Sequence, residues 1–287
     1  MENVILFEKD EKTKEVSLDL LKQTASLADP YTGKLPSSRP IEHWQFIEEI
    51  QEQVDKKNLS FAIEPIYIGK GESKKIKQLD PENKGIPGSY LFQPVVTKLN
   101  ITTPDYVREN YSTSIAIGYT EKGVQVAFGT NVHVCSNMCI FGGRLSVTYG
   151  NNKMPFDKLM ELVQKHMNEL PSIAESDFGI LNQYEQLPVN DRDIIETIGE
   201  MQINAVQGAY FGGDAPLNIG QVSHFTKGII GAHPNLLDLG GEERLMSLYD
   251  FYNMGTEILH PKRSEVSTVW PGVAHWGDYL NNRFNIN

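Results

Sequence analysis

Apolar residues recur at helical spacing early in the chain. Five of them lie three or four positions apart: Ile41, Trp44, Ile47, Ile50 and Val54. This spacing is typical of one apolar face of an α-helix. It predicts a helix over residues 41–57, with Pro40 in a first-turn position. We expect His43, beside Trp44, to lie at the surface or at an interface, and Ser17 to cap a short helix over residues 18–27.

Alternating apolar and polar residues mark a β-hairpin over about residues 112–130. The apolar positions of its two strands are Ile115, Ile117, Tyr119, Val124, Val126 and Phe128. Gly123 ends the polar turn between them and supplies the residue that tolerates positive φ. After Gly129 we expect a bend or bulge. Gly142 and Gly143 predict a further turn, and residues 144–150 predict another strand.

Two other strand patterns are interrupted by proline. Residues 59–69 alternate until Pro65, which predicts a peripheral or bulged strand. Residues 90–101 form a second such pattern. Between them, residues 69–89 are polar and rich in glycine and proline, which predicts a long loop of the kind that is often functional.

Helical patterns dominate the second half of the chain. They cover residues 155–170, 193–212, 219–233, 242–260 and 269–284. Helix, antiparallel strands and then a run of helices predict an α+β fold, an antiparallel sheet built round the hairpin and packed by N-terminal and C-terminal helices. We expect an N-terminal arm or strap (1–40) and one α+β domain (41–287), sheet-rich over 58–150 and helix-rich over 151–287.

Composition narrows the classes of function. The 287 residues carry a formal net charge of −11, so the global basic surface of nucleic-acid-binding proteins is absent from the composition. No apolar run is long enough for a membrane span. The first residues place apolar side chains before charges, the reverse of a signal peptide, and there are two cysteines. We therefore expect reduced thiols, a cytoplasmic location and no membrane partner.

One short segment is locally basic. Residues 69–78 contain four lysines: Lys70, Lys74, Lys75 and Lys77. Clustered lysines neutralise phosphates, so the segment is a candidate nucleic-acid contact. A solvated loop is the simpler interpretation of the same residues.

The segment 131–143 holds both cysteines. If its first part is extended, His133 and Cys135 point the same way, and Cys139 follows four residues later. Three interpretations stay open: a structural metal site of His133, Cys135 and Cys139, a Cys135 nucleophile with His133 or a distant histidine as base, and a buried structural turn. We favour the buried turn, because free cysteine packs as a small apolar residue.

Motifs for cofactors are missing from the sequence. The segment "GKGESKK" lacks the spacing of a phosphate-binding loop. The glycines of residues 228–243 lack the strand and helix that a dinucleotide fingerprint needs. We therefore expect no cofactor, and we favour a non-catalytic protein.

Two patches within residues 90–285 resemble a known family. "TSIAIGYTEKGVQVAFGTNVHVCSNMCIF" (113–141) is similar to a strand-turn-strand element that ends in a Cys-Ser/Thr-Asn signature, here at Asn137. "SLYDFYNMGTEILHPKRSEVSTVW" (247–270) resembles a late helix of the same family. The family is that of the uncharacterised phage/plasmid-like proteins, which bacterial mobile elements carry. The resemblance implies a phage, prophage or plasmid context in a bacterial host cell and implies no active site.

These observations give three functional hypotheses. The first is a non-catalytic, oligomeric factor of DNA metabolism that handles or anneals single strands. The second is a counter-defence protein that binds a bacterial host protein complex. The third is a cysteine- or metal-dependent enzyme centred on Cys135 and His133. Besides the basic segment, the candidate binding residues are Asn137, Asn253, Glu257, Lys262 and Arg263.

Overall fold

The computed structural model describes residues 13–24, 41–69, 72–74, 90–92, 94–120, 123–133, 140–149, 156–211, 217–232, 245–259 and 271–286. The strands are β1 (Thr13–Val16), β2 (Phe61–Ile63), β3 (Ile66–Gly69), β4 (Glu72–Lys74), β5 (Tyr90–Phe92), β6 (Val95–Ile101), β7 (Tyr111–Thr120), β8 (Gly123–Val132), β9 (Phe141–Tyr149), β10 (Pro188–Asn190) and β11 (Leu245–Ser247). The helices are α1 (Leu18–Thr24), α2 (His43–Asp55), the 3₁₀ helix η1 (Pro104–Tyr106), α3 (Phe156–Gln186), α4 (Asp191–Phe211), α5 (Ile219–Ala232), α6 (Leu248–Leu259) and α7 (Pro271–Phe284).

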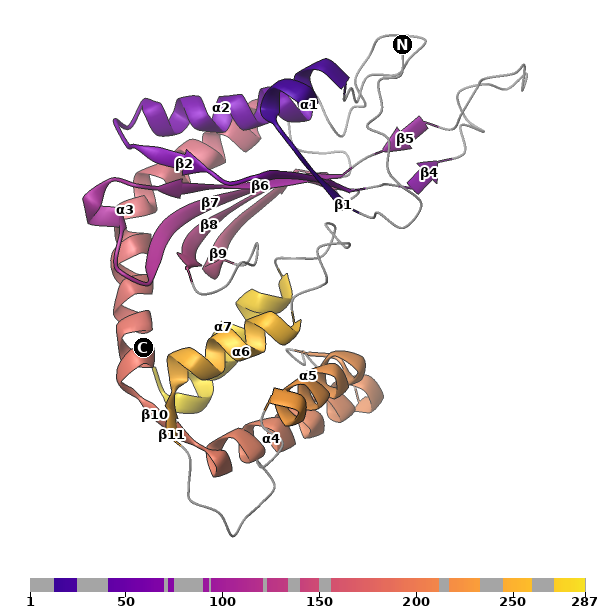
Figure 1. Cartoon of the computed structure of the whole chain (residues 1–287), viewed down its shortest axis with the longest axis vertical. Helices are drawn as coiled ribbons and strands as arrows, with labels where there is room; N and C mark the ends of the chain where they lie inside the picture. Colours follow the sequence, from indigo (N-terminus) through magenta and orange to yellow (C-terminus); the bar gives the residue numbers. More distant parts are fainter. Residues whose placement is uncertain are drawn as a thin grey trace.

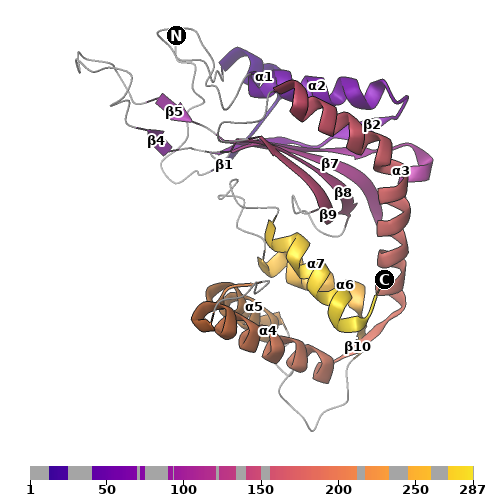
Figure 2. The same ribbon diagram turned by 180° about the vertical axis from the view of Figure 1, so that it is seen from behind.

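An antiparallel sheet of seven strands organises the fold. Its order is β1-β3-β6-β7-β8-β9, and β2 also pairs with β6. Helices α1 and α2 and the first part of α3 cover one face, while α6 and α7 lie on the opposite side with α4 and α5 beyond them (Figures 1 and 2). The predicted α+β architecture is therefore confirmed, with the hairpin β7–β8 at its centre.

The hairpin residues predicted to share a face do so. Ile115, Ile117 and Tyr119 of β7 pack with Val124, Val126 and Phe128 of β8 in one core with α2 and α3. The opposite face carries small and polar residues, because side chains alternate along a strand. Ala116 and Ala127, which pair across the hairpin, lie on that second face and are buried there with Ile140.

Helix α2 forms where its apolar stripe predicts it. Phe46, Ile47, Ile50 and Val54 are buried against the sheet. The helix begins at His43, later than expected, and the backbone N–H of Glu42 donates to the Gln45 side chain at 3.0 Å. The expectation of a surface or interfacial His43 is wrong: it is 2 % exposed, and its ring meets the Tyr119 ring edge-on.

Both prolines divide a predicted strand into two. Glu64 and Pro65 separate β2 from β3, and both of these strands pair with β6. Pro94 separates β5 from β6, since proline has no N–H to donate to a ladder. The described part of the predicted N-terminal arm forms β1, which pairs with β3, and α1, whose Leu20 N–H donates to Ser17 Oγ at 3.1 Å.

A bulge replaces the turn predicted at Gly142 and Gly143. Both glycines lie inside β9, and the β8–β9 register shifts between Phe128 and Thr130. Gly142 has a φ of +80°, which glycine adopts without strain. A Cβ atom there would lie 2.5 Å from Asp177 Oδ1 of α3. Thr130 Oγ1 donates to Asp177 Oδ2 at 3.0 Å, so the bulge is where α3 docks on the sheet.

Helix α3 is twice as long as predicted. The expected end at residue 170 is wrong, because the 31-residue helix continues through Pro171. Proline removes one backbone hydrogen bond, yet Pro171 is exposed, so its ring needs no place in the core. The helix bends in its middle part and passes from the sheet to the C-terminal helices (Figure 2).

The C-terminal helices form a second core with the end of α3. Asn190 and Asp193 cap α4 reciprocally, and Asn218 and Gln221 cap α5 in the same way. Helix α6 starts at Leu248, later than predicted, because residues 245–247 pair with β10 as β11. The core of this layer is aromatic, and Trp276 Nε1 donates to the Tyr252 carbonyl at 3.1 Å.

We predict that Gly142→Ala lowers the free energy of unfolding by about 2–3 kcal/mol. The alanine must adopt an unfavourable φ, and its Cβ must displace the Asp177 carboxylate. Gly199→Ala in α4 is the matched control, since nothing lies within 4 Å of its Cβ, and it should stabilise by about 0.5–1 kcal/mol. Urea unfolding checks both, and an unchanged Gly142→Ala variant contradicts the docking role.

Candidate functional site

The structure places only part of the cysteine segment. His133 follows β8 and is exposed, with Nε2 at 3.1 Å from Ser112 Oγ and Nδ1 at 3.3 Å from the Glu109 carbonyl oxygen. Cys135, Asn137 and Cys139 lie outside the described residues. Among the residues that the structure does describe, no three His, Cys, Asp or Glu side chains are grouped so as to hold a metal ion.

The other predicted binding residues fall in two places. Lys74 belongs to β4, whereas Lys70, Lys75 and Lys77 lie outside the described residues. Asn253 and Glu257 lie one turn apart on α6, the first buried and the second exposed. Lys262 and Arg263 also lie outside the described residues, so the structure does not bring the predicted polar cluster together.

The second face of the sheet holds a buried polar network. Lys98 of β6 is 1 % exposed, and its Nζ donates to Asn131 Oδ1 at 2.7 Å. The same Nζ lies 3.4 Å from Glu64 Oε1, which also accepts a hydrogen bond from Asn100 Nδ2. Ser114 Oγ donates to Asn100 Oδ1 at 2.6 Å. A lysine can be buried in this way because Asn131 on β8 and Glu64 in the β2–β3 connection satisfy its charge.

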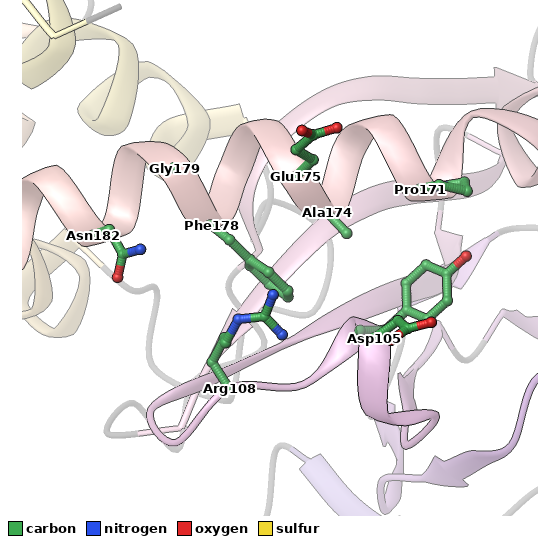
Figure 3. Close-up of a pocket in the computed structure, with 9 residues that line it drawn as sticks. Asp105, Arg108, Pro171, Ala174, Glu175, Phe178, Gly179 and Asn182 are labelled. Atoms are coloured by element: carbon green, nitrogen blue, oxygen red, sulfur yellow. The ribbon is translucent and has the colours of Figure 1, made fainter.

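A pocket of about 560 Å³ lies between η1 and α3 (Figure 3). Its lining comes from two distant stretches of the chain. These residues are Asp105, Tyr106, Arg108, Pro171, Ala174, Glu175, Phe178, Gly179 and Asn182. Its volume is within the range typical of small-molecule sites.

Local sequence explains the wall that η1 contributes. Pro104 starts the 3₁₀ turn, and the Ser60 N–H donates to Thr103 Oγ1 at 2.9 Å. After this turn the Arg108 N–H donates to the Tyr111 carbonyl at 2.8 Å. The chain between β6 and β7 is thereby held as a compact turn beside α3.

Arg108 and Phe178 form a stacked pair in the pocket. The guanidinium carbon lies 4.7 Å from the centroid of the Phe178 ring (Figure 3). Phe178 is 4 % exposed, whereas Arg108 is exposed. The guanidinium therefore lies over the ring, and apart from Nη1, which donates to the Val107 carbonyl at 2.8 Å, it retains its donors.

The remaining polar groups supply both acceptors and donors. Asp105 and Glu175 form no hydrogen bond or ion pair with any described residue. The Tyr111 hydroxyl donates to Asn182 Oδ1 at 3.1 Å, which leaves Asn182 Nδ2 as a donor. Burial and the nearby Asp105 carboxylate raise the pKa of Tyr106, so its hydroxyl stays protonated at neutral pH.

Sequence reasoning missed this pocket. Asp105 and Arg108 stand in a polar connection between two strands, and Phe178 and Asn182 lie beyond residue 170, where the predicted helix ended. The useful signal was the apolar stripe of α3, which continues past Pro171 at the same spacing. Juxtaposition of residues some 70 positions apart has no local signature.

The helices of the described residues include none that is both long enough and apolar enough to cross a membrane. Comparison of the chain with models of known protein families, with curated proteins and with solved structures found no match.

We predict that Lys98→Met destabilises the protein by about 3 kcal/mol. The substitution leaves the Asn131 and Glu64 acceptors without their charged partner inside the sheet. Lys158→Met removes an exposed lysine that is paired with Glu161 and should cost less than about 0.5 kcal/mol. Chemical denaturation compares the two variants. Equal stabilities would show that the network does not support the sheet.

Proposed function

We propose that the protein is a non-catalytic factor that handles single-stranded nucleic acid and acts as an oligomer, in a phage or plasmid context. The observation that carries the proposal is the position of the basic segment, residues 69–78, which begins at the end of β3. Residues 70–93 connect the paired ends of β3 and β6, and the Gly69 N–H donates to the Pro94 carbonyl at 2.7 Å across that junction. The two ends of this connection are therefore held together at the sheet.

The described part of this connection forms a ladder of its own. Strand β4 pairs with β5, and the register sets Lys74 opposite Tyr90 and Glu72 opposite Phe92. We call residues 69–94 the basic ribbon. Lysines interleaved with aromatic residues are typical of surfaces that bind single strands, because cations contact phosphates and rings stack on bases.

The acidity of the whole chain is compatible with a local contact. Residues 69–78 carry four lysines and one glutamate, in a chain whose formal net charge is −11. Salt screens distant surface charges within about 10 Å, so nearby lysines dominate the contact with a phosphate. Repulsion from the rest of the chain should keep the affinity modest and strongly dependent on salt.

A second candidate function is supported by one observation on α4 and α5. Four of the seven large apolar side chains that are exposed among the described residues lie on these helices: Ile203, Val206, Ile219 and Ile230. Such side chains favour a protein contact. Our proposal requires that a second copy of the chain binds to this surface. The alternative function requires that a bacterial host protein binds there. The particle mass of the purified protein separates them: an oligomer supports the proposal, and a monomer that retains a stoichiometric host protein supports the alternative.

We predict that reversing the charge of the ribbon weakens binding to single-stranded DNA at least tenfold at low salt. The ribbon variant carries glutamate at positions Lys70, Lys74, Lys75 and Lys77. Each lost phosphate contact should lower the salt slope by about 0.7, so four should lower it by roughly 3. Fluorescence anisotropy with a labelled oligonucleotide measures both quantities.

The matched control places the same four reversals just after α2 and on α3. Its positions are the exposed lysines Lys56, Lys57, Lys158 and Lys165. The control should bind much more tightly than the ribbon variant, although both have the same net charge. Failure of the unaltered protein to bind single strands at low salt, or equal losses in the two variants, refutes the proposed function.

A further inference from the structure

From its lining we infer that the pocket between η1 and α3 binds a guanine base. This inference rests on the proposed function, because it names the base that a bound single strand would place there. A pocket of about 560 Å³ accommodates a nucleoside. It has a stacking surface, a charged acceptor and a side-chain donor, which together fit a flat heterocycle with polar edges.

The stacking surface is the Arg108 guanidinium. It lies over the Phe178 ring, with its carbon 4.7 Å from the ring centroid, and its Nη1 donates to the Val107 carbonyl at 2.8 Å, so both contacts restrict its orientation. Unstacked bases pack on arginine planes and on aromatic rings when proteins recognise single strands. A base over Arg108 would extend the stack that Phe178 begins.

The hydrogen-bonding groups select among bases. Asp105 has no partner among the described residues, so its carboxylate is available as an acceptor, whereas the Glu175 carboxylate points away from Asp105 and Arg108 (Figure 3). Guanine offers adjacent donors at N1 and N2, which a carboxylate accepts together, whereas thymine offers a single ring N–H. Asn182 Nδ2, left over from the bond with Tyr111, is a donor suited to the O6 or N7 acceptors.

Charge determines which part of a nucleotide enters. Two carboxylates and one guanidinium line the pocket, so acidic groups outnumber basic ones and a phosphate beside the carboxylates is disfavoured. The base enters and the backbone remains outside. Strand β6 leads from the basic ribbon to the turn that forms the pocket, and its seven residues span roughly 23 Å, a distance that a short single strand can cover.

Gly179 allows the pocket to be filled without disturbing the core. Nothing lies within 4 Å of a Cβ atom built there, and Gly179 is exposed on the helix wall of the pocket. Glutamine at this position should occupy the pocket and favour the helix. Gly199→Gln on α4, which is equally open, is the control for the substitution itself.

The experiment compares two oligonucleotides of about 20 nucleotides, oligo-dT and the same chain with dG at every fifth position. The unaltered protein should bind the dG-containing chain about tenfold more tightly, the discrimination that one bidentate pair provides. Asp105→Asn and Gly179→Gln should remove this difference. Asp55→Asn, the same change at an exposed residue of α2, and Gly199→Gln should retain it.

Free guanosine, titrated by calorimetry, separates the two claims. Equal affinity of the unaltered protein for the two oligonucleotides overturns the guanine pocket and leaves the proposed function standing. Binding of neither oligonucleotide overturns the proposed function, and guanosine then decides the pocket. If guanosine gives heat of binding with the unaltered protein and none with the Gly179→Gln variant, the pocket is a site for a free nucleoside. If guanosine gives no heat with the unaltered protein, the guanine pocket is overturned as well.

Discussion

The apolar stripe of α3 is the constraint on which the rest of the structure depends. Its buried residues follow one another at three or four positions along the whole helix: Leu159, Val163, Met167, Leu170, Ala174, Phe178, Leu181 and Tyr184. The first four belong to the core beneath α2, and the last four belong to the core of the C-terminal helices. One continuous helix therefore packs into both cores. Packing of either half in its own core stabilises the helix as a whole, and so supports the half that packs in the other core.

The docking point and the pocket both follow from this helix. Asp177 fixes the position of α3 along the sheet, because Thr130 donates to the Asp177 carboxylate and Gly142 leaves room for that carboxylate. One residue further, Phe178 covers the guanidinium of Arg108 on the η1 turn. The proposed base site is thus built where the helix leaves the first core for the second, and its geometry depends on the same docking that joins the two cores.

The elements that could be predicted are those whose signal is local. The helix α2 and the hairpin β7–β8 follow from spacing alone, and Asn190 and Asn218 lie at the helix starts that their side chains favour. The predicted helix ended at residue 170, but α3 continues because an exposed proline such as Pro171 costs a helix one hydrogen bond and leaves its apolar stripe intact. The sequence predicts a turn at Gly142. Only the close approach of the Asp177 carboxylate shows why the bulge requires glycine at this position. The buried Lys98 network and the pocket could not be predicted, because each joins residues far apart in the chain.

The central claim is that α3 makes the two cores one cooperative unit. Native-state hydrogen exchange in increasing denaturant tests it directly, by comparing the slowest amides of β7 with those of α6. We expect the opening free energies of the two sets to converge within about 0.5 kcal/mol, with the same dependence on denaturant. Exchange of α6 through a separate, lower-energy opening, while β7 stays protected, would contradict the account.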